Sequence, residues 1–553
     1  MNSTAKSSSC PGLAVVASAL FVYTLGGCGD GAASGDGSNG AGGAAGGWFS
    51  DESQDAGASD SSGAKSDAGG LPAKDTAAPP PPEKEPEADF GAPESSPNFV
   101  YIPATDADRL VRISGASLAV SLIEVSAQPT RVKVLPNDDI ALVLHRGADE
   151  LAVVRSTEAG DQVTTLPILP HCNALVLDAA GKHAIAWYDH ATAKPGDPVG
   201  SLQAVSLVRI AAGKDAALSL STGFRPRSVT FTSDGSKALV VTDDGISIIG
   251  LATAQDGDIV PPVAVTDKPL TKVDREVQLT DDGLWALARE ANSTEIAIVY
   301  LPSKKLVTLA MPATPTDLDL VPKGGGALLV LRDAQLVAHV TLPSAATESF
   351  PVKLAPLGDL FAGLARLTDD GKTAVLYTSI AGTEQVGVLA LGTGTVQPVA
   401  IKKTVDNVLL VTGSRKAVLM HKPAPGPGYN DPAEKFVDDA HGYTLLDLDT
   451  GYTKLVITPV KPTEVAFSAA PVKAWFLLPD SAGLAHALQG AAMDTFLTAD
   501  HPLGSKPEHA RYLPMAGVVA VTQSHPSGRV TFVNAVTGLA KTVTGYELNG
   551  KVK

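Results

Sequence analysis

One unit of sequence recurs along most of this chain: an apolar strand, a tight turn rich in Asp and Gly, and a second apolar strand. The clearest copies are SVTFTSDGSKALVV (228–241), EVQLTDDGLWALAR (276–289) and LARLTDDGKTAVLY (364–377). A hairpin turn favours these residues, because Gly adopts a positive φ without strain and Asp bonds to its own turn. Because the whole unit recurs, and not only the turn, we predict a repeat protein built from strands.

The spacing of the units indicates their class. The last apolar residues before the turns are Leu135, Leu177, Phe231, Leu279, Leu320, Leu367, Val411, Phe467 and Leu513. These nine anchors are separated by 41 to 56 residues, and further strands such as TEIAIVYL (294–301) follow them. A period in the forties, filled by about four short strands, is typical of a propeller blade and not of a helical or leucine-rich repeat. We therefore predict an all-β fold, a single large β-propeller of four-stranded blades.

The first unit is incomplete. The segment NFVYIPATDADRLVRIS (98–114) supplies a second and a third strand without a first. Nine anchors and this partial unit predict about nine blades, within a range of seven to ten. We expect strands from both chain ends to close the ring, with residues near Gly550 to Lys553 as the missing inner strand, because closure removes exposed sheet edges. The propeller is predicted over residues 98–553.

Three segments resemble a known family: YIPATDADRLVRIS (101–114), VVTDDGISIIGL (240–251) and VAVTQSHPSGRVTFVNAVTG (519–538). They look like the YVTN repeats of bacterial surface-protein propellers, which are similar in architecture to lactonase-type and WD40 propellers. The resemblance covers residues 98–549, but its copies are degenerate and the YVTN tetrapeptide is never intact. It implies a fold and transfers no catalytic residue.

The N-terminus predicts export. A polar start with Lys6 is followed by the apolar run LAVVASALFVYT (13–24) and by Leu25, Gly26, Gly27 and Cys28. Twelve apolar residues suit a signal peptide and are too few for a membrane-spanning helix. LGGC resembles the lipobox of bacterial lipoproteins, which implies removal of residues 1–27 and a lipid on Cys28. An ordinary secretory signal with a cysteine at its cleavage site is the alternative.

Residues 28–97 are expected to be a disordered tether. Residues 29–70 consist mainly of Gly, Ala, Ser and Asp, and residues 71–97 are rich in Pro, Glu and Ala. Such compositions bury too little apolar surface to offset the entropy of ordering. A long tether, unless it is low-complexity drift, suits a domain that works away from its membrane. We expect an outer-membrane or cell-surface lipoprotein, or alternatively a periplasmic one.

Charge and cysteine content exclude some classes. The formal net charge of −16 disfavours binding to nucleic acid, because the field of the molecule repels phosphate backbones. Two of the three cysteines, Cys10 and Cys28, precede the folded domain, so no intramolecular disulfide framework is expected. Cys172 lies beside His171, but we interpret it as a half-buried strand residue rather than a reactive thiolate.

Polar residues are expected around the mouth of the central channel, because the innermost strand of each blade begins there. The residues four positions before the anchors are Arg131, Asn173, Arg227, Arg275, Thr316, Gly363, Asn407, Thr463 and His509. Six of them form our candidate ligand site: Arg131, Asn173, Arg227, Arg275, Asn407 and His509. Converging guanidinium groups could hold a small anionic ligand. Alternatively, Glu276, Asp317 and Glu464 neutralise them in ordinary ion pairs.

Two insertions lengthen loops on the same predicted face, residues 188–201 and 422–442. Loops on a rigid scaffold often carry binding residues, so Tyr188, His190, Tyr429 and Phe436 are candidate contacts for a protein partner. Surface elaboration without function is the alternative. The second insertion contains Asn430, Asp431, Glu434, Asp438 and Asp439, but their spacing fits no calcium loop.

Two functions stay open. No HExxH, CxxC, GxSxG or phosphate-loop motif occurs. We therefore expect a monomeric binding or scaffold module that is not an enzyme and holds no cofactor or metal. The alternative is a lactonase-type hydrolase with acids and a metal at the channel mouth, because a site assembled from scattered blade residues leaves no linear motif. Three or more carboxylate, Asn or His groups within metal-binding distance would distinguish it.

Overall fold

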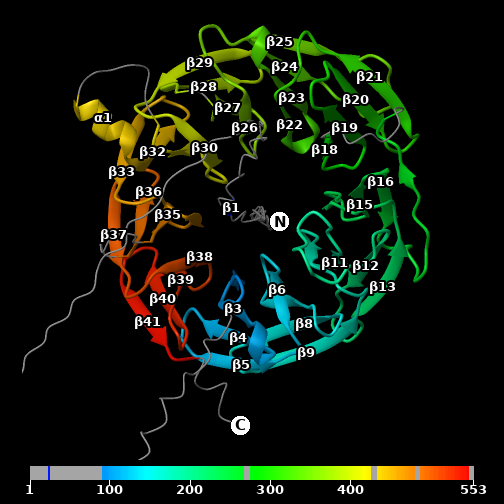
Figure 1. The fold of residues 1–553 in the computed structure, drawn as a ribbon, viewed down its shortest axis with the longest axis vertical. Coiled ribbons are helices and arrows are strands. Elements are labelled where there is room, and N and C mark those ends of the chain that lie inside the picture. Colours follow the sequence, from blue (N-terminus) through cyan, green and yellow to red (C-terminus); the bar gives the residue numbers. More distant parts are fainter. Residues whose placement is uncertain are drawn as a thin grey trace, which may run out of the picture. The chain divides into compact units, whose positions relative to one another are not determined.

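The prediction of an all-β propeller is confirmed by the computed structural model. The structure describes residues 23–24, 90–266, 275–380, 382–424, 432–479 and 486–546, with only the backbone for residues 23–24 and 432–434. Ten antiparallel sheets are arranged as blades around a common axis, which we call the channel axis (Figure 1). Helical structure in these ranges is limited to α1 (Pro432–Asp439) and the short η1 (Thr105–Ala107), η2 (Pro322–Gly324) and η3 (Arg332–Ala334).

Each blade has four strands in chain order from the channel to the outer rim (Figure 1). Blades 1 to 5 consist of β2 (Glu94–Ser95), β3 (Phe99–Ala104), β4 (Arg109–Ser114), β5 (Val120–Glu124); β6 (Pro129–Val134), β7 (Ile140–His145), β8 (Glu150–Thr157), β9 (Gly160–Pro167); β10 (Ala174–Leu177), β11 (His183–Trp187), β12 (Ala204–Arg209), β13 (Ala216–Ser221); β14 (Ser228–Phe231), β15 (Lys237–Thr242), β16 (Gly245–Gly250), β17 (Pro262–Val263); and β18 (Arg275–Leu279), β19 (Trp285–Glu290), β20 (Glu295–Tyr300), β21 (Lys305–Ala310). Blades 6 to 10 consist of β22 (Asp317–Val321), β23 (Gly326–Leu331), β24 (Leu336–Val340), β25 (Val352–Pro356); β26 (Leu364–Leu367), β27 (Thr373–Tyr377), β28 (Gln385–Ala390), β29 (Thr395–Ala400); β30 (Val405–Leu410), β31 (Lys416–His421), β32 (His441–Asp447), β33 (Thr453–Thr458); β34 (Glu464–Ala469), β35 (Val472–Leu478), β36 (Ala487–Ala492), β37 (Thr498–Pro502); and β38 (Pro507–Leu513), β39 (Val518–Gln523), β40 (Arg529–Asn534), β41 (Ala540–Thr544).

The Asp-Gly turns fold as the sequence predicts. In blade 4, Asp234 accepts the Thr232 hydroxyl at 2.6 Å and the Ser236 N–H at 2.9 Å, while Gly235 has φ +66°. Asp282 and Asp370 take the same place in blades 5 and 7, each accepting a Thr hydroxyl at 2.6 Å. The recurring Asp contacts of these turns therefore have a structural role.

Packing between neighbouring blades closes the ring. Ten hydrophobic clusters each join two consecutive blades, and the tenth joins blade 10 to blade 1 through residues such as Phe532 and Ile102. The clusters consist mainly of Val, Leu, Ile and Ala that are nearly inaccessible to solvent. Burial of this kind is the main stabilising contribution expected for a fold without disulfides.

The expectation that the first unit lacks its own inner strand is wrong. That place is taken by β2, whose Glu94 and Ser95 pair with Tyr101 and Val100 of β3. Ser95 Oγ also donates to the Tyr512 carbonyl of blade 10 at 3.1 Å, so β2 contributes to the closing seam. Residues 550–553, the predicted closing strand, lie outside the described residues. Within the described residues, each of the ten blades takes its four strands from consecutive segments of the chain.

The N-terminal strand β1 (Tyr23–Thr24) pairs with the innermost strand of blade 9, where Tyr23 lies opposite Val465 and Thr24 opposite Glu464. Its residues belong to the apolar run that the sequence predicts as part of a signal peptide. Within the described ranges, no helix has the length and apolar character that a membrane crossing requires.

Candidate binding face

The two ends of the channel carry different loops. The innermost strands begin on one face, and the connections between second and third strands lie on that same face. We call it the loop face, because both insertions emerge there: residues 188–203 between β11 and β12 of blade 3, and residues 422–440 between β31 and β32 of blade 8. Blades 3 and 8 are five positions apart in a ring of ten, so the insertions stand on opposite sides of the channel (Figure 1).

Two of the three candidate arginines pair with carboxylates of their own blade. The Arg275 guanidinium lies 2.7 Å from Glu290, and both side chains are largely buried. Arg227 contacts Asp243 but keeps 60% of its side chain exposed. Arg131 is exposed at the start of β6. The alternative interpretation of these residues as ordinary ion pairs therefore describes Arg227 and Arg275, although their partners are not the carboxylates that the sequence suggested.

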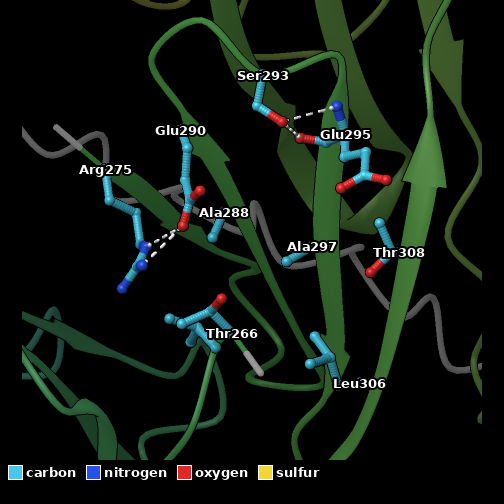
Figure 2. A pocket seen from close by; sticks show the side chains of 10 residues that line it. Thr266, Arg275, Ala288, Glu290, Ser293, Glu295, Ala297, Leu306 and Thr308 are labelled. Carbon is cyan, nitrogen blue, oxygen red and sulfur yellow. Dashed lines mark hydrogen bonds and ion pairs between the residues drawn. The ribbon is translucent and has the colours of Figure 1, made fainter. Parts of the chain in front are cut away.

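Figure 2 shows the surroundings of Arg275. Its guanidinium reaches Glu290, while Ser293 accepts the Glu295 N–H at 3.1 Å (Figure 2). The cavity beside them measures about 30 Å³, which is room for about two water molecules. A cavity of this size can hydrate the ion pair and is too small for an organic ligand.

Three other polar residues that lie four positions before an anchor form hydrogen bonds with the backbone of the loop face. Asn173 exchanges two hydrogen bonds with the main chain of Asp189, at 2.6 and 3.0 Å. Thr316 donates to the Gly363 carbonyl at 2.8 Å, which ties blade 6 to blade 7. Asn407 lies at a bulge of β30, where its amide oxygen accepts the Val408 N–H at 2.8 Å.

Charged side chains that the sequence did not predict to be in contact form a network where blades 10 and 1 close the ring. His509 lies 3.1 Å from Glu464, which also pairs with Arg511. Arg511 lies 3.7 Å from Glu94, and Glu94 lies 2.9 Å from Lys133. These side chains come from blades 9, 10, 1 and 2. They form ion pairs with one another across the seam, so their first role is to join the blades.

A second charged group lies on the inner strands of blades 5 to 7 and is rich in carboxylates. Asp317 and Asp319 occupy alternate positions of β22, which places them on one face of the strand. Asp317 accepts the Ala365 N–H at 2.7 Å, whereas Oδ2 of Asp319 has no hydrogen-bond partner among the described residues. Burial, and secondarily the charge of Asp317, raises the pKa of Asp319 to about 7.

This carboxylate pair can hold a proton near neutral pH, which is the property of a general acid or base. Its surroundings include Glu276, which pairs with Arg289, and Arg366, which lies 4.0 Å from Asp319. In the described part of the chain no three His, Cys, Asp or Glu side chains converge as a metal site. The sequence signal that could have found the pair is two charges inside a predicted inner strand, since buried strands rarely contain them.

The blade 3 insertion is folded against the propeller. Tyr188 is only 2% exposed, so it lies in the core rather than on the binding surface, whereas His190 is exposed. Farther along the insertion, Asp197 lies 3.0 Å from Arg146 of blade 2. A Cβ atom at Gly200 would come within 2.8 Å of Tyr188, which shows how closely the insertion packs.

The blade 8 insertion is hydrogen-bonded to the propeller by Lys403 and leaves the side chain of Phe436 exposed to solvent. Lys403, whose side chain is almost fully buried, donates to the carbonyls of Val437 and Asp438 at 2.6 and 2.8 Å. These carbonyls belong to the last turn of α1 and have no partner inside the helix. A cation there stabilises the helix, because the C-terminal end of a helix carries a partial negative charge. Phe436 on the same helix is 65% exposed. Tyr429, Asn430 and Asp431 lie outside the described residues.

Two further exposed apolar side chains lie on the loop face in the neighbouring blade 7. Phe361 is 43% exposed and Ile380 is 71% exposed. The Gly363 N–H donates to the Tyr377 carbonyl at 2.9 Å, which brings the two loops carrying these residues together. We call Phe361, Ile380 and Phe436 the apolar rim. Lys422 of the insertion donates to the Ser379 carbonyl, which connects the rim across blades 7 and 8.

Cys172 is buried, and its Sγ lies 3.2 Å from the Leu169 carbonyl. Burial raises the pKa of this thiol to about 12. A thiol of that kind is protonated at neutral pH and is a poor nucleophile.

No family model matches the chain, and no curated protein matches it. Several solved propeller structures are similar to this chain. A structure described as the eukaryotic initiation factor is 11% identical with a TM-score of 0.44, covering 75% of this chain and 96% of that one. The periplasmic gluconolactonase of Pseudomonas aeruginosa is 15% identical with a TM-score of 0.33, covering 59% and 96%. A putative 6-phosphogluconolactonase of Bacteroides uniformis is 14% identical with a TM-score of 0.32, covering 60% and 97%.

The prediction that this chain is not an enzyme is contradicted by these comparisons, because the matched propellers include two that are described as lactonases. That prediction relied on the lack of a linear motif, and a site built from several blades leaves none. At such identities and scores the comparisons assign neither an activity nor a substrate. What they have in common with this chain is the β-propeller.

Proposed function

We propose that this chain is an exported lipoprotein whose YVTN-like propeller binds a protein partner at the apolar rim of its loop face. Lipid on Cys28 anchors it to the outer membrane, and residues 29–89 separate the anchor from the domain. Export and anchoring follow from the apolar run before LGGC, and display at the cell surface follows from the length of the intervening sequence.

The binding role relies on one observation, the way in which Lys403 holds the blade 8 insertion. A buried amine is costly unless it is hydrogen-bonded, and the Lys403 amine donates to two carbonyls of α1. The helix is thereby fixed to the scaffold while Phe436 stays 65% exposed. An aromatic side chain on a preorganised support is the usual anchor of a protein interface, since little entropy is lost on binding.

Photocrosslinking in intact cells tests the binding role. A photoreactive phenylalanine analogue at position 436 is compared with the same analogue at position 214, an exposed site on the opposite face of blade 3. We expect a discrete adduct with one protein from position 436, weakened when Phe361 and Ile380 are changed to Ser. Equal adduct patterns from positions 436 and 214 would remove the proposed binding surface.

Labelling with radioactive palmitate tests the anchor separately. Wild-type chain is compared with Cys28→Ser, while Cys10→Ser serves as the matched cysteine control. The proposal expects label in the wild type and in Cys10→Ser, and none in Cys28→Ser. Incorporation into Cys28→Ser at the wild-type level would eliminate the lipoprotein assignment.

A further inference from the structure

Exposed apolar side chains gather on one part of the face opposite the loop face. We call that face the turn face, because it carries the turns that join first to second strands and third to fourth strands. Of the fourteen large apolar side chains that are exposed in the described residues, six lie there on blades 8, 9 and 10, which are neighbours in the ring (Figure 1). These six, which we call the turn patch, are Tyr452, Val472, Leu497, Met515, Val536 and Leu539.

The turns that carry the patch are in contact between blades 8 and 9. The Tyr452 ring stacks on the Phe496 ring with centroids 5.8 Å apart, and Leu497 follows Phe496 directly. Lys454 Nζ of blade 8 also donates to the Phe496 carbonyl at 2.7 Å. The exposed side chains of Tyr452 and Leu497 therefore belong to one surface.

The same surface continues into blade 10. Lys473 Nζ of blade 9 donates to the Ala535 carbonyl of blade 10 at 2.7 Å. Val472 and Val536 are the chain neighbours of these two residues. The Ala535 N–H donates in turn to the Gly517 carbonyl at 2.9 Å, which joins the two turns of blade 10. The patch is thus a contiguous apolar surface across three blades, and such a surface on a folded domain marks an interaction site.

Hairpin geometry does not require these apolar side chains. In blades 4, 5 and 7 the turn between the first two strands has an aspartate that accepts a Thr hydroxyl, namely Asp234, Asp282 and Asp370. The corresponding turns of blades 9 and 10 contain residues 470–472 (APV) and 514–517 (PMAG), which carry no charge. Met515 is 75% exposed, so it contributes little to the packing of its own blade. The apolar character of the patch is therefore not explained by folding alone.

The charges around the patch are mainly positive. The turns of blades 8 to 10 and the residues beside them contain five cations and three carboxylates, although the whole chain has a net charge of −16. They are Arg415, Lys416, Lys454, Lys473 and Lys541, and Asp447, Asp449 and Asp494. Two of the carboxylates form ion pairs with Arg415 and Lys416, which leaves three lysines against one aspartate. A negatively charged surface is therefore attracted to this side of the turn face.

The position of the patch side chains favours a lipid surface over a protein. A protein interface concentrates its binding energy in a closely packed centre, whereas these side chains lie at separate turns. A fluid headgroup layer accommodates separate side chains, and its binding strength grows with the buried apolar area and with the attraction to anionic lipids. Tyr452 suits such a layer, because Tyr is enriched at membrane–water interfaces. The neighbouring lysines can extend their amines toward the phosphates while their stems stay on apolar surface.

We propose that the turn patch docks on an anionic lipid surface, with its apolar side chains among the headgroups and the neighbouring lysines near the lipid phosphates. In that orientation the loop face, which carries the apolar rim, points away from the lipid. The docking goes beyond the proposed function, because it depends neither on acylation of Cys28 nor on a partner at the apolar rim.

Vesicle binding by the full chain tests the docking. Cys10 and Cys28 are changed to Ser, which removes the acylation site, while Cys172 stays because its thiol is buried. Every chain keeps the same N-terminal apolar run, so that any binding through that run is common to all of them.

The readout is a polarity-sensitive nitrobenzoxadiazole label on a single introduced cysteine. It is placed at Leu539, which is 72% exposed in the patch. One control carries the label at Lys214, which is exposed on the turn face of blade 3, and another carries it at Ile380 on the loop face. With vesicles of equal parts phosphatidylglycerol and phosphatidylcholine, we expect the emission at position 539 to rise severalfold and shift to the blue. The labels at positions 214 and 380 should not respond.

Two sets of changes separate the apolar and the charged contributions. Met515→Ser together with Leu497→Ser should weaken vesicle binding at least about tenfold, because two large apolar side chains are lost. Lys541→Glu should weaken it severalfold, and vesicles of phosphatidylcholine alone should bind less than anionic ones. Since all three side chains are exposed, the variants should keep the wild-type melting temperature.

Equal responses at positions 539 and 214, or binding that is insensitive to Met515 and Leu497, would overturn the proposal. Sedimentation of the vesicle-free chain as a dimer that the double change dissociates would overturn it as well, since the patch would then bind a second copy. Neither result alters what palmitate labelling and photocrosslinking show, so the lipid-docking face and the proposed function are tested separately.

Discussion

The two insertions on the loop face join the same pair of strands in their blades, but one buries an aromatic residue and the other exposes one. In blade 3, Tyr188 is buried, and the Asn173 side chain is hydrogen-bonded to both the N–H and the carbonyl of Asp189. In blade 8, Lys403 is buried and the aromatic residue, Phe436, is exposed. Each insertion is fixed by a polar group, Asn173 or Lys403, but the Tyr188 side chain faces the core whereas the Phe436 side chain faces solvent.

This difference teaches that insertion length alone does not identify a binding loop. An insertion that buries its own aromatic residue stabilises the blade below it. An insertion that is fixed by a buried polar group and leaves its aromatic residue exposed has surface available for a partner. The blade 3 insertion is therefore expected to influence stability, and the blade 8 insertion to influence binding.

The largest expected effect separates the two aromatic residues. Tyr188→Ala should lower the free energy of unfolding by about 3 kcal/mol, because a buried aromatic side chain is replaced by a cavity. Phe436→Ala should change it by less than about 0.5 kcal/mol, since an exposed side chain has few contacts to lose. Urea denaturation followed by tryptophan fluorescence measures both. Similar losses in the two variants would erase the distinction between the insertions.

A smaller effect is expected for the lysine under α1. Lys403→Met should destabilise the blade 8 insertion by about 2 kcal/mol, because the carbonyls of Val437 and Asp438 lose a charged donor. Hydrogen exchange should accelerate in residues 432–440 and stay unchanged in β31 and β32. Lys402→Met, at the exposed neighbouring lysine, is the control. Unchanged exchange in the helix would show that the insertion is not held by Lys403.

Replacing Asn173, the corresponding polar residue of blade 3, should lower the free energy of unfolding by somewhat less. Asn173→Ala removes the two hydrogen bonds to Asp189 and should cost about 1.5 kcal/mol, mostly because the main chain loses its partners. The matched change is Thr463→Ala, at the equivalent but exposed position of blade 9. Thermal denaturation of both variants gives the difference. An equal effect at the two positions would mean that Asn173 does not fix the insertion.

The fold was predictable because hairpin turns and alternating strands are local signals that each blade repeats. Asp234, Asp282 and Asp370 mark such turns, and the structure uses them as the sequence indicates. The inner strand β2 was missed, because a strand of two residues between Pro93 and Pro97 carries no alternating pattern. Its pairing with β3 depends on the surrounding ring.

The site was less predictable, because partners in a ring are remote in sequence. Arg275 was correctly placed at the start of an inner strand, but its partner Glu290 lies at the end of the next strand and becomes adjacent only through the hairpin. The orientation of Tyr188 depends on how residues 188–203 fold back, which no periodic pattern encodes. The exposure of Phe436 depends on Lys403, 33 positions earlier in the sequence.

The smallest expected effect is a pH dependence confined to the blade 3 insertion. Asp197 accepts the Lys194 N–H at 3.0 Å and lies 3.0 Å from Arg146. These contacts, the backbone hydrogen bond first, hold the pKa of its carboxyl below the usual value. The folded state therefore binds this proton less readily than the unfolded state, so the stabilisation is present above about pH 4 and is lost as the pH falls through the lower folded pKa. Hydrogen-exchange protection in residues 190–198 should decrease between pH 5 and pH 3, and Asp197→Asn should remove that dependence. Residues 432–440 should keep their protection, because the Lys403 amine is bonded to main-chain carbonyls, which do not titrate in this range. Equal loss of protection in both insertions would show that acid loosens the whole loop face rather than the contact of Asp197.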